Sequence, residues 1–258
     1  MNNQKIRVAF THGDTNGIGY ELIFKTFAET DMFEICTPIV YGSPKIAAYH
    51  CNVLGIEGNS FSIINNASEA KDGRLNLIPV FDEETKVDLG MPSQEASKAA
   101  IKSLDRAITD YKDGLYDVLI TCPIDKNNMH IGGFNFPCNE KFIESCIGDG
   151  KKGLCILMNE DLRVVLMTDD ISLKNVPIVE KAAMLFTTLR RDFRISNPRI
   201  AVMALNPNSN NEHPGKEETE AIIPAVQALS DAGVQAFGPY QADDFFGSCK
   251  YTAFDGIL

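Results

Sequence analysis

The sequence predicts an α/β fold in which a largely parallel sheet carries helices on both faces. Apolar runs typical of buried strands alternate along the chain with segments whose apolar residues recur at three- and four-residue steps. Strands separated by helices pair in parallel, because each crossover returns the chain to the same end of the sheet. The short connection at 159–163 instead favours an antiparallel hairpin, which interrupts the parallel pattern.

The predicted strands share short runs of apolar or β-branched residues that end at polar or glycine-containing turns. In chain order they are expected at 5–11, 37–41, 62–65, 75–80, 117–122, 154–158, 164–168, 200–205 and 236–238. Most of them are followed by enough chain for a covering helix, as a sheet with two covered faces requires.

The helix with the strongest signal is expected over 93–112. Its residues Ala100, Leu104 and Ala107 fall on one apolar stripe, and a glycine shortly afterwards ends it. Pro224 lies inside the segment 217–233, so that helix should have a kink or a shifted start. Further helices are predicted at 20–29, 141–146 and 179–190.

The composition excludes several classes of partner. The chain has 258 residues, with 24 Lys and Arg against 35 Asp and Glu, and a formal net charge of −11. Nucleic acid is excluded, since its binding depends on basic side chains, and no apolar run approaches the roughly 20 residues of a membrane span. Seven scattered cysteines without a C-x-x-C pair favour mostly buried free thiols in a reducing compartment. The amino-terminal residues lead directly into a strand, so no signal peptide and a cytoplasmic protein are expected.

A second lobe is expected at 125–200, where the hairpin interrupts the parallel order. Residues 1–124 and 201–258 would then form the first lobe as a discontinuous unit. No stretch rich in Pro, Gly or Ser separates the two parts, so we expect them to share an interface without a flexible tether.

Ligands of α/β sheets bind where strands end and helices begin, so the strand-to-helix loops are the candidate site. The loop at 11–21 contains Asp14 and glycines that would let the backbone approach a ligand, and the helix start offers N–H groups to an anion. The alternative is a tight turn in which Asp14 caps the helix. Its spacing matches neither the dinucleotide-binding fingerprint nor a P-loop. The loop at 121–126 ends in Lys126, which could meet a phosphate or carboxylate or could simply be solvated.

Two further loops carry potential metal ligands. The segment at 168–170 ends in adjacent carboxylates, and Asp170 could bind a hard metal or cap the following helix. The loop at 205–218 is long and polar, as functional loops often are. It contains His213, which is the best candidate imidazole for catalysis or metal binding, with a surface role as the alternative.

These loops, in this order, resemble those of the 4-hydroxythreonine-4-phosphate dehydrogenases of pyridoxal phosphate biosynthesis. The resemblance extends from the first strand to Leu258. The matching segments are Gly13-Asp14-Thr15-Asn16-Gly17-Ile18-Gly19-Tyr20-Glu21 (family G-D-P-x-G-I-G-P-E), Gly90-Met91-Pro92-Ser93 through Ala107, Thr121-Cys122-Pro123-Ile124-Asp125-Lys126 (family T-A-P-I-N-K) and Leu205-Asn206-Pro207.

The resemblance implies an isocitrate/isopropylmalate-dehydrogenase-like α/β/α fold of two lobes, with the lobe at 125–200 forming a homodimer. It also implies oxidation of a secondary alcohol on a small phosphorylated substrate by NAD or NADP, followed by decarboxylation. A divalent metal such as Zn²⁺, Mg²⁺, Mn²⁺ or Co²⁺ would bind the alcohol oxygen and polarise the resulting ketone.

Several family positions hold other residues in this chain. Asn139 and Glu140 stand where the family's substrate-binding His and Thr are expected, and Asp170 and Asn208 stand at two metal-ligand histidines. His213 lies close enough to Asn208 in sequence to help rebuild a site. The third metal histidine of the family lies beyond Leu258, so the chain is expected to be short at its C-terminus. The alternatives to the dehydrogenase are a catalytically impaired paralogue with a binding or structural role and, more distantly, a phosphate-acyltransferase-like enzyme.

Overall fold

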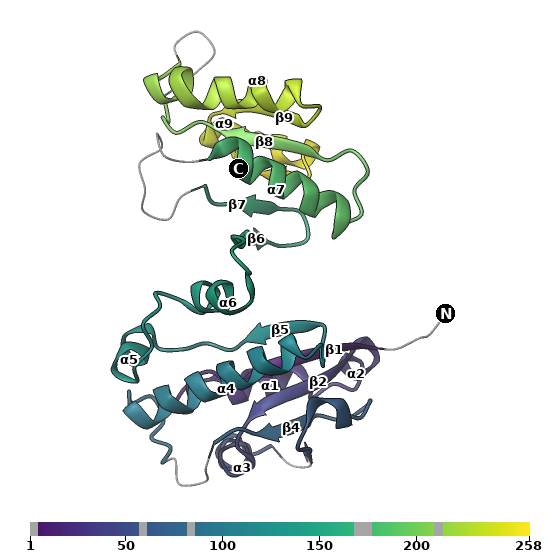
Figure 1. Cartoon of the computed structure of the whole chain (residues 1–258), viewed down its shortest axis with the longest axis vertical. Helices are drawn as coiled ribbons and strands as arrows, with labels where there is room; N and C mark the ends of the chain where they lie inside the picture. Colours follow the sequence, from purple (N-terminus) through teal and green to yellow (C-terminus); the bar gives the residue numbers. More distant parts are fainter. Residues whose placement is uncertain (1–4, 57–60, 82–85, 168–176, 209–213) are drawn as a thin grey trace. The chain divides into compact units, whose positions relative to one another are not determined.

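The computed structural model describes residues 5–56, 61–81, 86–167, 177–208 and 214–258. The chain divides into two compact units, Met1–Lys152 and Gly153–Leu258. Each unit contains its own five-stranded sheet with helices packed against it (Figure 1). The α/β class predicted from the sequence is therefore confirmed in both units.

The sheet of the first unit is parallel throughout, with the strand order β3-β4-β2-β1-β5. Its strands are β1 (Ile6–Thr11), β2 (Cys36–Gly42), β3 (Ser62–Ile63), β4 (Asn76–Pro79) and β5 (Val118–Thr121). All five lie within segments that the apolar runs predict or overlap them closely. The carboxyl ends of the strands consequently share one edge of the sheet.

The helices of the first unit cover both faces of this sheet. They are α1 (Gly19–Thr26), α2 (Met32–Ile35), α3 (Pro44–Leu54), the 3-10 turn η1 (Ala67–Glu69), α4 (Gln94–Lys112), α5 (Lys126–Ile131) and α6 (Asn139–Ile147). Because strand residues alternate between faces, Val8 and Phe10 pack with α1 and α3, whereas Ala9 packs with α4. The predicted apolar stripe of α4 is confirmed by the burial of Ala100, Leu104 and Ala107.

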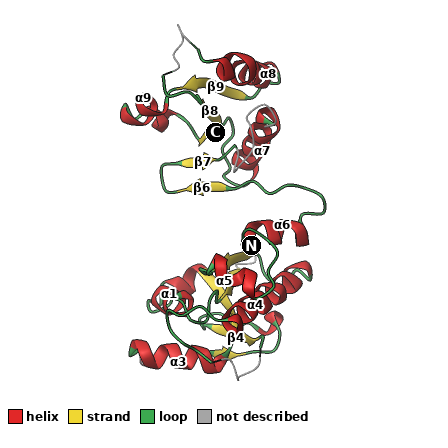
Figure 2. Cartoon of the chain, turned by 90° about the vertical axis from the view of Figure 1, so that its left-hand side faces the viewer, coloured by secondary structure: helices red, strands yellow, loops and turns green. Residues whose placement is uncertain are grey.

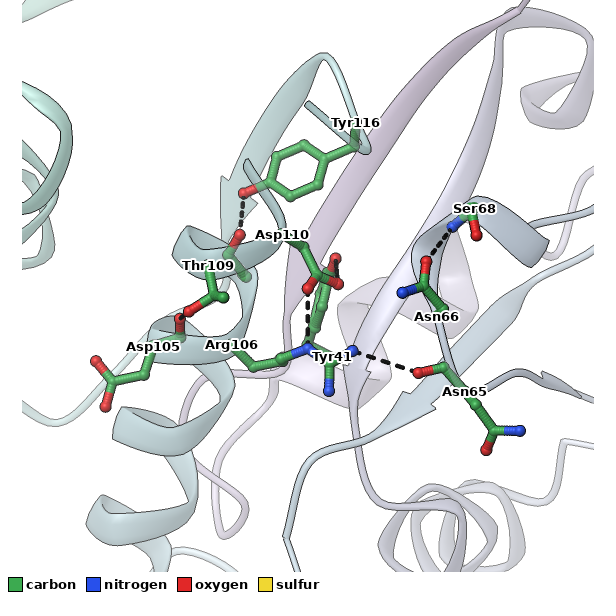
Figure 3. Close-up of polar contacts among 10 residues, drawn as sticks. Tyr41, Asn65, Asn66, Ser68, Asp105, Arg106, Thr109, Asp110 and Tyr116 are labelled. Atoms are coloured by element: carbon green, nitrogen blue, oxygen red, sulfur yellow. Dashed lines mark hydrogen bonds and ion pairs between the residues drawn. The ribbon is translucent and has the colours of Figure 1, made fainter. Parts of the chain in front are cut away.

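A buried polar network fixes α4 to the sheet (Figure 3). The Tyr41 hydroxyl of β2 donates to Asp110 Oδ2 at 2.8 Å, and Arg106 Nε donates to Asp110 Oδ1 at 2.9 Å. Arg106 also reaches the carbonyl oxygen of Asn65, and the Tyr116 hydroxyl donates to the α4 carbonyl of Ala107. Asp110 thus has a partner on each carboxylate oxygen, as a buried charge requires.

The sheet of the second unit has the order β6-β7-β10-β8-β9. Its strands are β6 (Ile156–Met158), β7 (Arg163–Val165), β8 (Arg199–Met203), β9 (Gln235–Tyr240) and β10 (Gly256–Ile257). The predicted antiparallel hairpin is confirmed by the pairing of β6 with β7, and the remaining neighbours are parallel. Strand β10 has only two residues, which are too few to show an alternation, and it lies where the resemblance to the family places a further core strand at the end of this chain.

The helices of the second unit are α7 (Ile178–Arg191), α8 (Ile223–Asp231) and α9 (Ala242–Gly247), with the π-helical turn η3 (Glu218–Ile222) and the 3-10 turn η4 (Lys250–Ala253). Helices α7 and α8 cover one face of the sheet, and α9 lies on the other (Figure 2). The expected irregularity at Pro224 is confirmed, since α8 begins beside this proline and η3 precedes it.

The division into units differs from the expected lobes of 1–124 with 201–258 and of 125–200. Helices α5 and α6 belong to the first unit, because Met129, Phe134 and Phe142 pack against α4. Strands β8 and β10 belong with the hairpin, because β10 pairs with both β7 and β8. The short connection at 159–163 thus predicts the antiparallel pair correctly. It does not predict where the unit that contains this pair begins and ends.

Two further observations concern the chain as a whole. Within the described residues, no helix is both long and apolar enough to cross a membrane. All seven cysteines are free, as their irregular spacing predicts, but only Cys36 and Cys122 are buried, so the expectation that most of them are buried is wrong.

Candidate functional site

Three loops meet at the carboxyl edge of the first sheet, and Ser93 connects them. Ser93 is the N-cap of α4 and accepts a hydrogen bond from Ala96 N at 3.1 Å. Its hydroxyl also accepts from Asn16 Nδ2 in the loop after β1, at 3.2 Å. Its carbonyl oxygen accepts from Asn128 Nδ2 in α5, which follows β5, at 2.9 Å. The start of α4 is thus held by side chains from two other strand-end loops.

Asn16 fixes the loop after β1 through both ends of its side-chain amide. Its Nδ2 donates to Met91 O at 2.7 Å, and its Oδ1 accepts from Asp88 N at 2.9 Å. The backbone adds a bond from Gly90 N to Asn16 O. Asn16 is almost fully buried, so these bonds satisfy a polar group that burial would otherwise penalise.

The glycines of this loop allow tight internal packing. A Cβ at Gly13, where φ is +72°, would lie 2.2 Å from Pro123 O, and one at Gly19 would lie 1.9 Å from His12 O. No side chain fits at either position because of contacts within the chain itself, and the approach of this backbone to a ligand stays a prediction. Asp14 does not cap α1 either: its Oδ1 accepts from Asn16 N within the turn, and the N-cap of α1 is Ile18, without a side-chain bond.

A stack of rings lies beneath the loop. His12 is fully buried and stacks on Tyr20, with ring centroids 5.4 Å apart, and Tyr20 stacks on His50 at 5.2 Å. Neither ring nitrogen of His12 has a hydrogen-bond partner within the described part of the chain. Burial lowers the pKa of His12 to about 4, so the ring is neutral around pH 7.

Asp14 lies near a second carboxylate, that of Asp125. Both Asp14 and Asp125 line a narrow gap, too small for a water molecule, with Ser97, Asn128, Ala96, Ala100, Ile124 and Met129. Burial, and then the nearby Asp125, raise the pKa of Asp14 against the opposing bond from Asn16 N. Asp125 itself caps α5 by accepting from Asn127 N and Asn128 N. This edge of the site is acidic.

Lys126, Asn139 and Glu140 lie at the starts of α5 and α6, in the same unit as Asp14. A hydrogen bond with the Cys138 thiol, followed by its own backbone N–H and the charge of Lys126, lowers the pKa of Glu140. Asn139 Oδ1 is buried and has no hydrogen-bond partner within the described residues. The structure therefore brings the charges of Lys126 and Glu140 close enough to interact.

In the second unit, the loop after β8 is anchored by Glu218. The Glu218 side chain is fully buried, and its Oε1 accepts from Leu205 N at 2.9 Å and Asn206 N at 2.8 Å. Its Oε2 accepts from Asn206 Nδ2 at 2.7 Å. Burial by itself would raise the pKa of Glu218, but the N–H groups of Asn206 outweigh it and hold the pKa below its usual value.

Of the three predicted metal-binding positions, only one lies within the described residues. Asn208 is exposed in the loop after β8, whereas Asp170 and His213 lie outside the described residues. Among the residues that are described, no cluster of three His, Cys, Asp or Glu side chains could hold a metal ion. The expected metal ligands thus remain predictions from the sequence.

Sequence reasoning missed Ser93, Asn128 and Glu218 as site-forming residues. Ser93 precedes a strong helical stripe and could have been recognised as an N-cap. Asn128 and Glu218 carry no local signal, because their partners lie far away in the sequence and become neighbours only in the fold.

Comparisons with known proteins agree along the whole chain. The family model described as pyridoxal phosphate biosynthetic protein PdxA matches residues 34–258. A 4-hydroxythreonine-4-phosphate dehydrogenase from Bacteroides thetaiotaomicron is 46% identical, with 100% of this chain and 73% of that protein covered. One from Sulfurihydrogenibium sp. is 31% identical, with 97% and 78% covered. The crystal structure of a 4-hydroxythreonine-4-phosphate dehydrogenase from Klebsiella pneumoniae matches with a TM-score of 0.82 at 26% identity, covering 98% of this chain and 80% of that one.

Proposed function

The chain belongs to the PdxA family, and we propose that it oxidises 4-hydroxythreonine 4-phosphate, or a related small phosphorylated hydroxy acid, in pyridoxal phosphate biosynthesis. Membership confirms the resemblance drawn from the loops, the isocitrate/isopropylmalate-dehydrogenase-like fold and the oxidoreductase class. The observation that carries the proposal is the 46% identity to a named dehydrogenase over the full length of this chain.

The proposed cofactor is NAD or NADP, whose nicotinamide takes the hydride that leaves the alcohol carbon. Lys126 supplies a cationic group for the substrate phosphate at the start of α5. Asn139 Oδ1, a buried acceptor without a described partner, accepts a hydrogen bond from a hydroxyl or amino group of the substrate. Asp14 and Asp125 lie close enough for their charges to interact, and this acidic pair is suited to a cationic or proton-carrying group.

For the divalent metal, we propose Asp170, Asn208 and His213 as ligands, with Zn²⁺, Mg²⁺, Mn²⁺ and Co²⁺ as candidates. The support is the oxygen and imidazole chemistry of these side chains and their place after β7 and β8 in the sequence. Bound metal would supply a Lewis acid for the decarboxylation that follows oxidation.

Glu140 sets an electrostatic constraint on this site. Its carboxylate lies near enough to Lys126 for the lysine to lower the pKa of Glu140, so it offsets part of the charge offered to phosphate. We therefore expect a high KM for the phosphorylated substrate. Glu140→Gln should lower that KM, and Lys126→Ala should raise it several-fold.

The direct test is reduction of NAD or NADP by the purified chain with 4-hydroxythreonine 4-phosphate and each metal in turn. Lys112→Ala, at the far exposed end of α4, is the matched control for Lys126→Ala and should leave the KM unchanged. Absence of turnover with every metal and both dinucleotides would overturn the proposal.

The second candidate is a paralogue that keeps the fold but has lost catalysis, favoured by Asn139 and Glu140 at the substrate positions of the family. Calorimetric titration separates the two. Tight binding of both a dinucleotide and the phosphorylated substrate supports the enzyme, and binding of neither supports the paralogue. We also propose a homodimer in the cytoplasm, which sedimentation of the purified chain and fractionation of cells would test.

A further inference from the structure

The carboxylate of Glu218 closes the base of the loop that follows β8. Its partners Leu205 and Asn206 are the residues that leave the strand, whereas Glu218 lies beyond the far end of the loop. Gly215 completes the closure, since a Cβ there would lie 2.2 Å from Glu218 Oε2 and 2.3 Å from Asn206 Nδ2. Both ends of the loop therefore converge on a single buried carboxylate.

The local backbone explains how Glu218 reaches this position. Pro224 has no N–H, so the α-helical bond from residue 224 to the carbonyl of Glu220 cannot form. The segment before it adopts the π-helical turn η3, of which Glu218 is the first residue. Such turns change the direction of side chains relative to the following helix and occur frequently at functional sites.

The bonding requires a carboxylate and not merely a side chain of that length. Burying an ionised carboxylate is costly unless donors surround it, and three N–H groups meet the two oxygens of Glu218. An amide at this position would turn an NH2 group toward Asn206 Nδ2, which is also a donor. The arrangement thus selects for charge at a position where no solvent reaches it.

We propose that Glu218 is a positioning residue, which clamps the base of the β8 loop and so sets where Asn208 is presented to the substrate. This inference rests on the proposed function, because it treats the loop as part of the dehydrogenase site. Glu218 contacts Leu205 and Asn206 and acts through them.

The test compares Glu218→Gln with Glu217→Gln in the full chain. Glu217 is the matched control, because it accepts from the same Asn206 Nδ2 at 3.1 Å but lies at an exposed site. Misplacing a reacting group by about 1 Å can cost about 100-fold in rate, so Glu218→Gln should lower kcat by about 10- to 100-fold. The KM for the dinucleotide should stay within about twofold, and Glu217→Gln should resemble the parent protein.

A swapped pair provides the rescue. In the variant Glu218→Gln with Asn206→Asp, made on a Glu217→Gln background so that no carboxylate faces the introduced aspartate, the introduced amide oxygen at 218 can still accept from the backbone N–H groups, and its NH2 can donate to the introduced carboxylate. Recovery of kcat in this variant is expected only if the geometry of the clamp matters. A rate as low as that of the single variant would contradict the proposal.

Hydrogen exchange at the Leu205 and Asn206 amides gives a readout that does not depend on turnover. Both amides should exchange about tenfold faster in Glu218→Gln and at the parental rate in Glu217→Gln and in the swapped pair. Unchanged exchange in Glu218→Gln would overturn the clamp even in an active enzyme. If the parent chain shows no turnover, the proposed function fails, and the exchange rates still decide whether Glu218 holds the loop.

Discussion

The loop after β1 and the loop after β8 have the same place in their sheets and are held by opposite means. Each leaves the carboxyl end of a buried strand, and each is associated with a fully buried ionisable side chain, His12 in one and Glu218 in the other. His12 has no hydrogen-bond partner among the described residues, whereas Glu218 has three donors. The first side chain is buried as a neutral ring and the second as a charge.

The difference shows that burial and polarity can be reconciled in two ways. The His12 ring is accommodated by shape, through its stacking on Tyr20 and its contact with Phe81, while Asn16 supplies the hydrogen bonds of that loop. In the second loop the buried group itself supplies the bonds. The β1 loop should therefore respond to changes of shape and to acid, and the β8 loop to removal of charge.

The largest effect is expected for Glu218→Ala, which leaves the backbone N–H groups of Leu205 and Asn206 without their acceptor, whereas Asn206 Nδ2 still has Glu217. Each unsatisfied group costs about 1–3 kcal/mol, so the unfolding free energy of the second unit should fall by about 4 kcal/mol. Urea unfolding followed by hydrogen exchange at β8 measures it. Glu217→Ala is the control and should change the free energy by less than about 0.5 kcal/mol. Equal losses of unfolding free energy in the two variants would show that the buried carboxylate of Glu218 stabilises this loop no more than an exposed one does.

Gly13→Ala tests how tightly the β1 loop packs, and it should lower the unfolding free energy of the first unit by about 3 kcal/mol. The new Cβ would clash with Pro123 O and would also force alanine into the left-handed region. Gly114→Ala isolates the second contribution, because Gly114 has φ +70° and a Cβ added there would meet nothing within 4 Å. That variant should lose only about 1 kcal/mol in the same urea experiment. Equal effects of the two substitutions would show that packing against Pro123 is unimportant.

Acid should weaken the two loops over different pH ranges. The pKa of His12 is about 4 in the folded chain against 6.5 when exposed, so the unfolded chain binds more protons between these values. The contribution of the neutral His12 to the unfolding free energy of the first unit is therefore fully present above pH 6.5. That free energy should be lower by roughly 3 kcal/mol at pH 4. The pKa of Glu218 lies below 4.5, so its contribution is present above 4.5 and is lost at lower pH.

The measurement is the unfolding free energy at several pH values in the parent chain and in His12→Phe, which keeps an aromatic ring in the stack. The variant should lose the decline between pH 6.5 and 4. A decline of the same size in His12→Phe would assign it to another group.

Much of the fold could be predicted from the sequence, because periodicity is a local property. The stripe on α4 and the hairpin of β6 and β7 follow from residue spacing alone. The place of α5 and α6 could not be predicted in this way, since it depends on the packing of Met129 and Phe134 against α4. Strand β10 is held between β7 and β8 and has too few residues to show an alternation.

The candidate site depends even more than the fold on contacts between residues that are remote in sequence. The loops predict Asp14 and Lys126 as candidates, but the roles of their neighbours depend on partners that are remote in sequence, as with Asn16 and Asp88. His213 attracted attention because imidazole is chemically versatile. Glu218, a carboxylate in an acidic run, gave no reason to expect that it is buried and bonded to the far end of its loop.

The smallest effect is expected for Tyr41→Phe. This variant tests whether hydrogen-bond donors around a buried carboxylate also stabilise the first unit, or do so only at the loop after β8. Asp110 is a buried carboxylate in the first unit, and Tyr41 and Arg106 are its partners (Figure 3). Removing the Tyr41 hydroxyl takes away one donor of the kind that surrounds Glu218. The unfolding free energy of the first unit, measured in urea, should fall by about 1–2 kcal/mol in Tyr41→Phe. It should stay almost unchanged in Tyr111→Phe, whose ring is exposed. A loss in Tyr41→Phe would show that a charge held by donors stabilises either unit. No loss would confine that mechanism to the loop after β8, with Arg106 alone sufficient for Asp110.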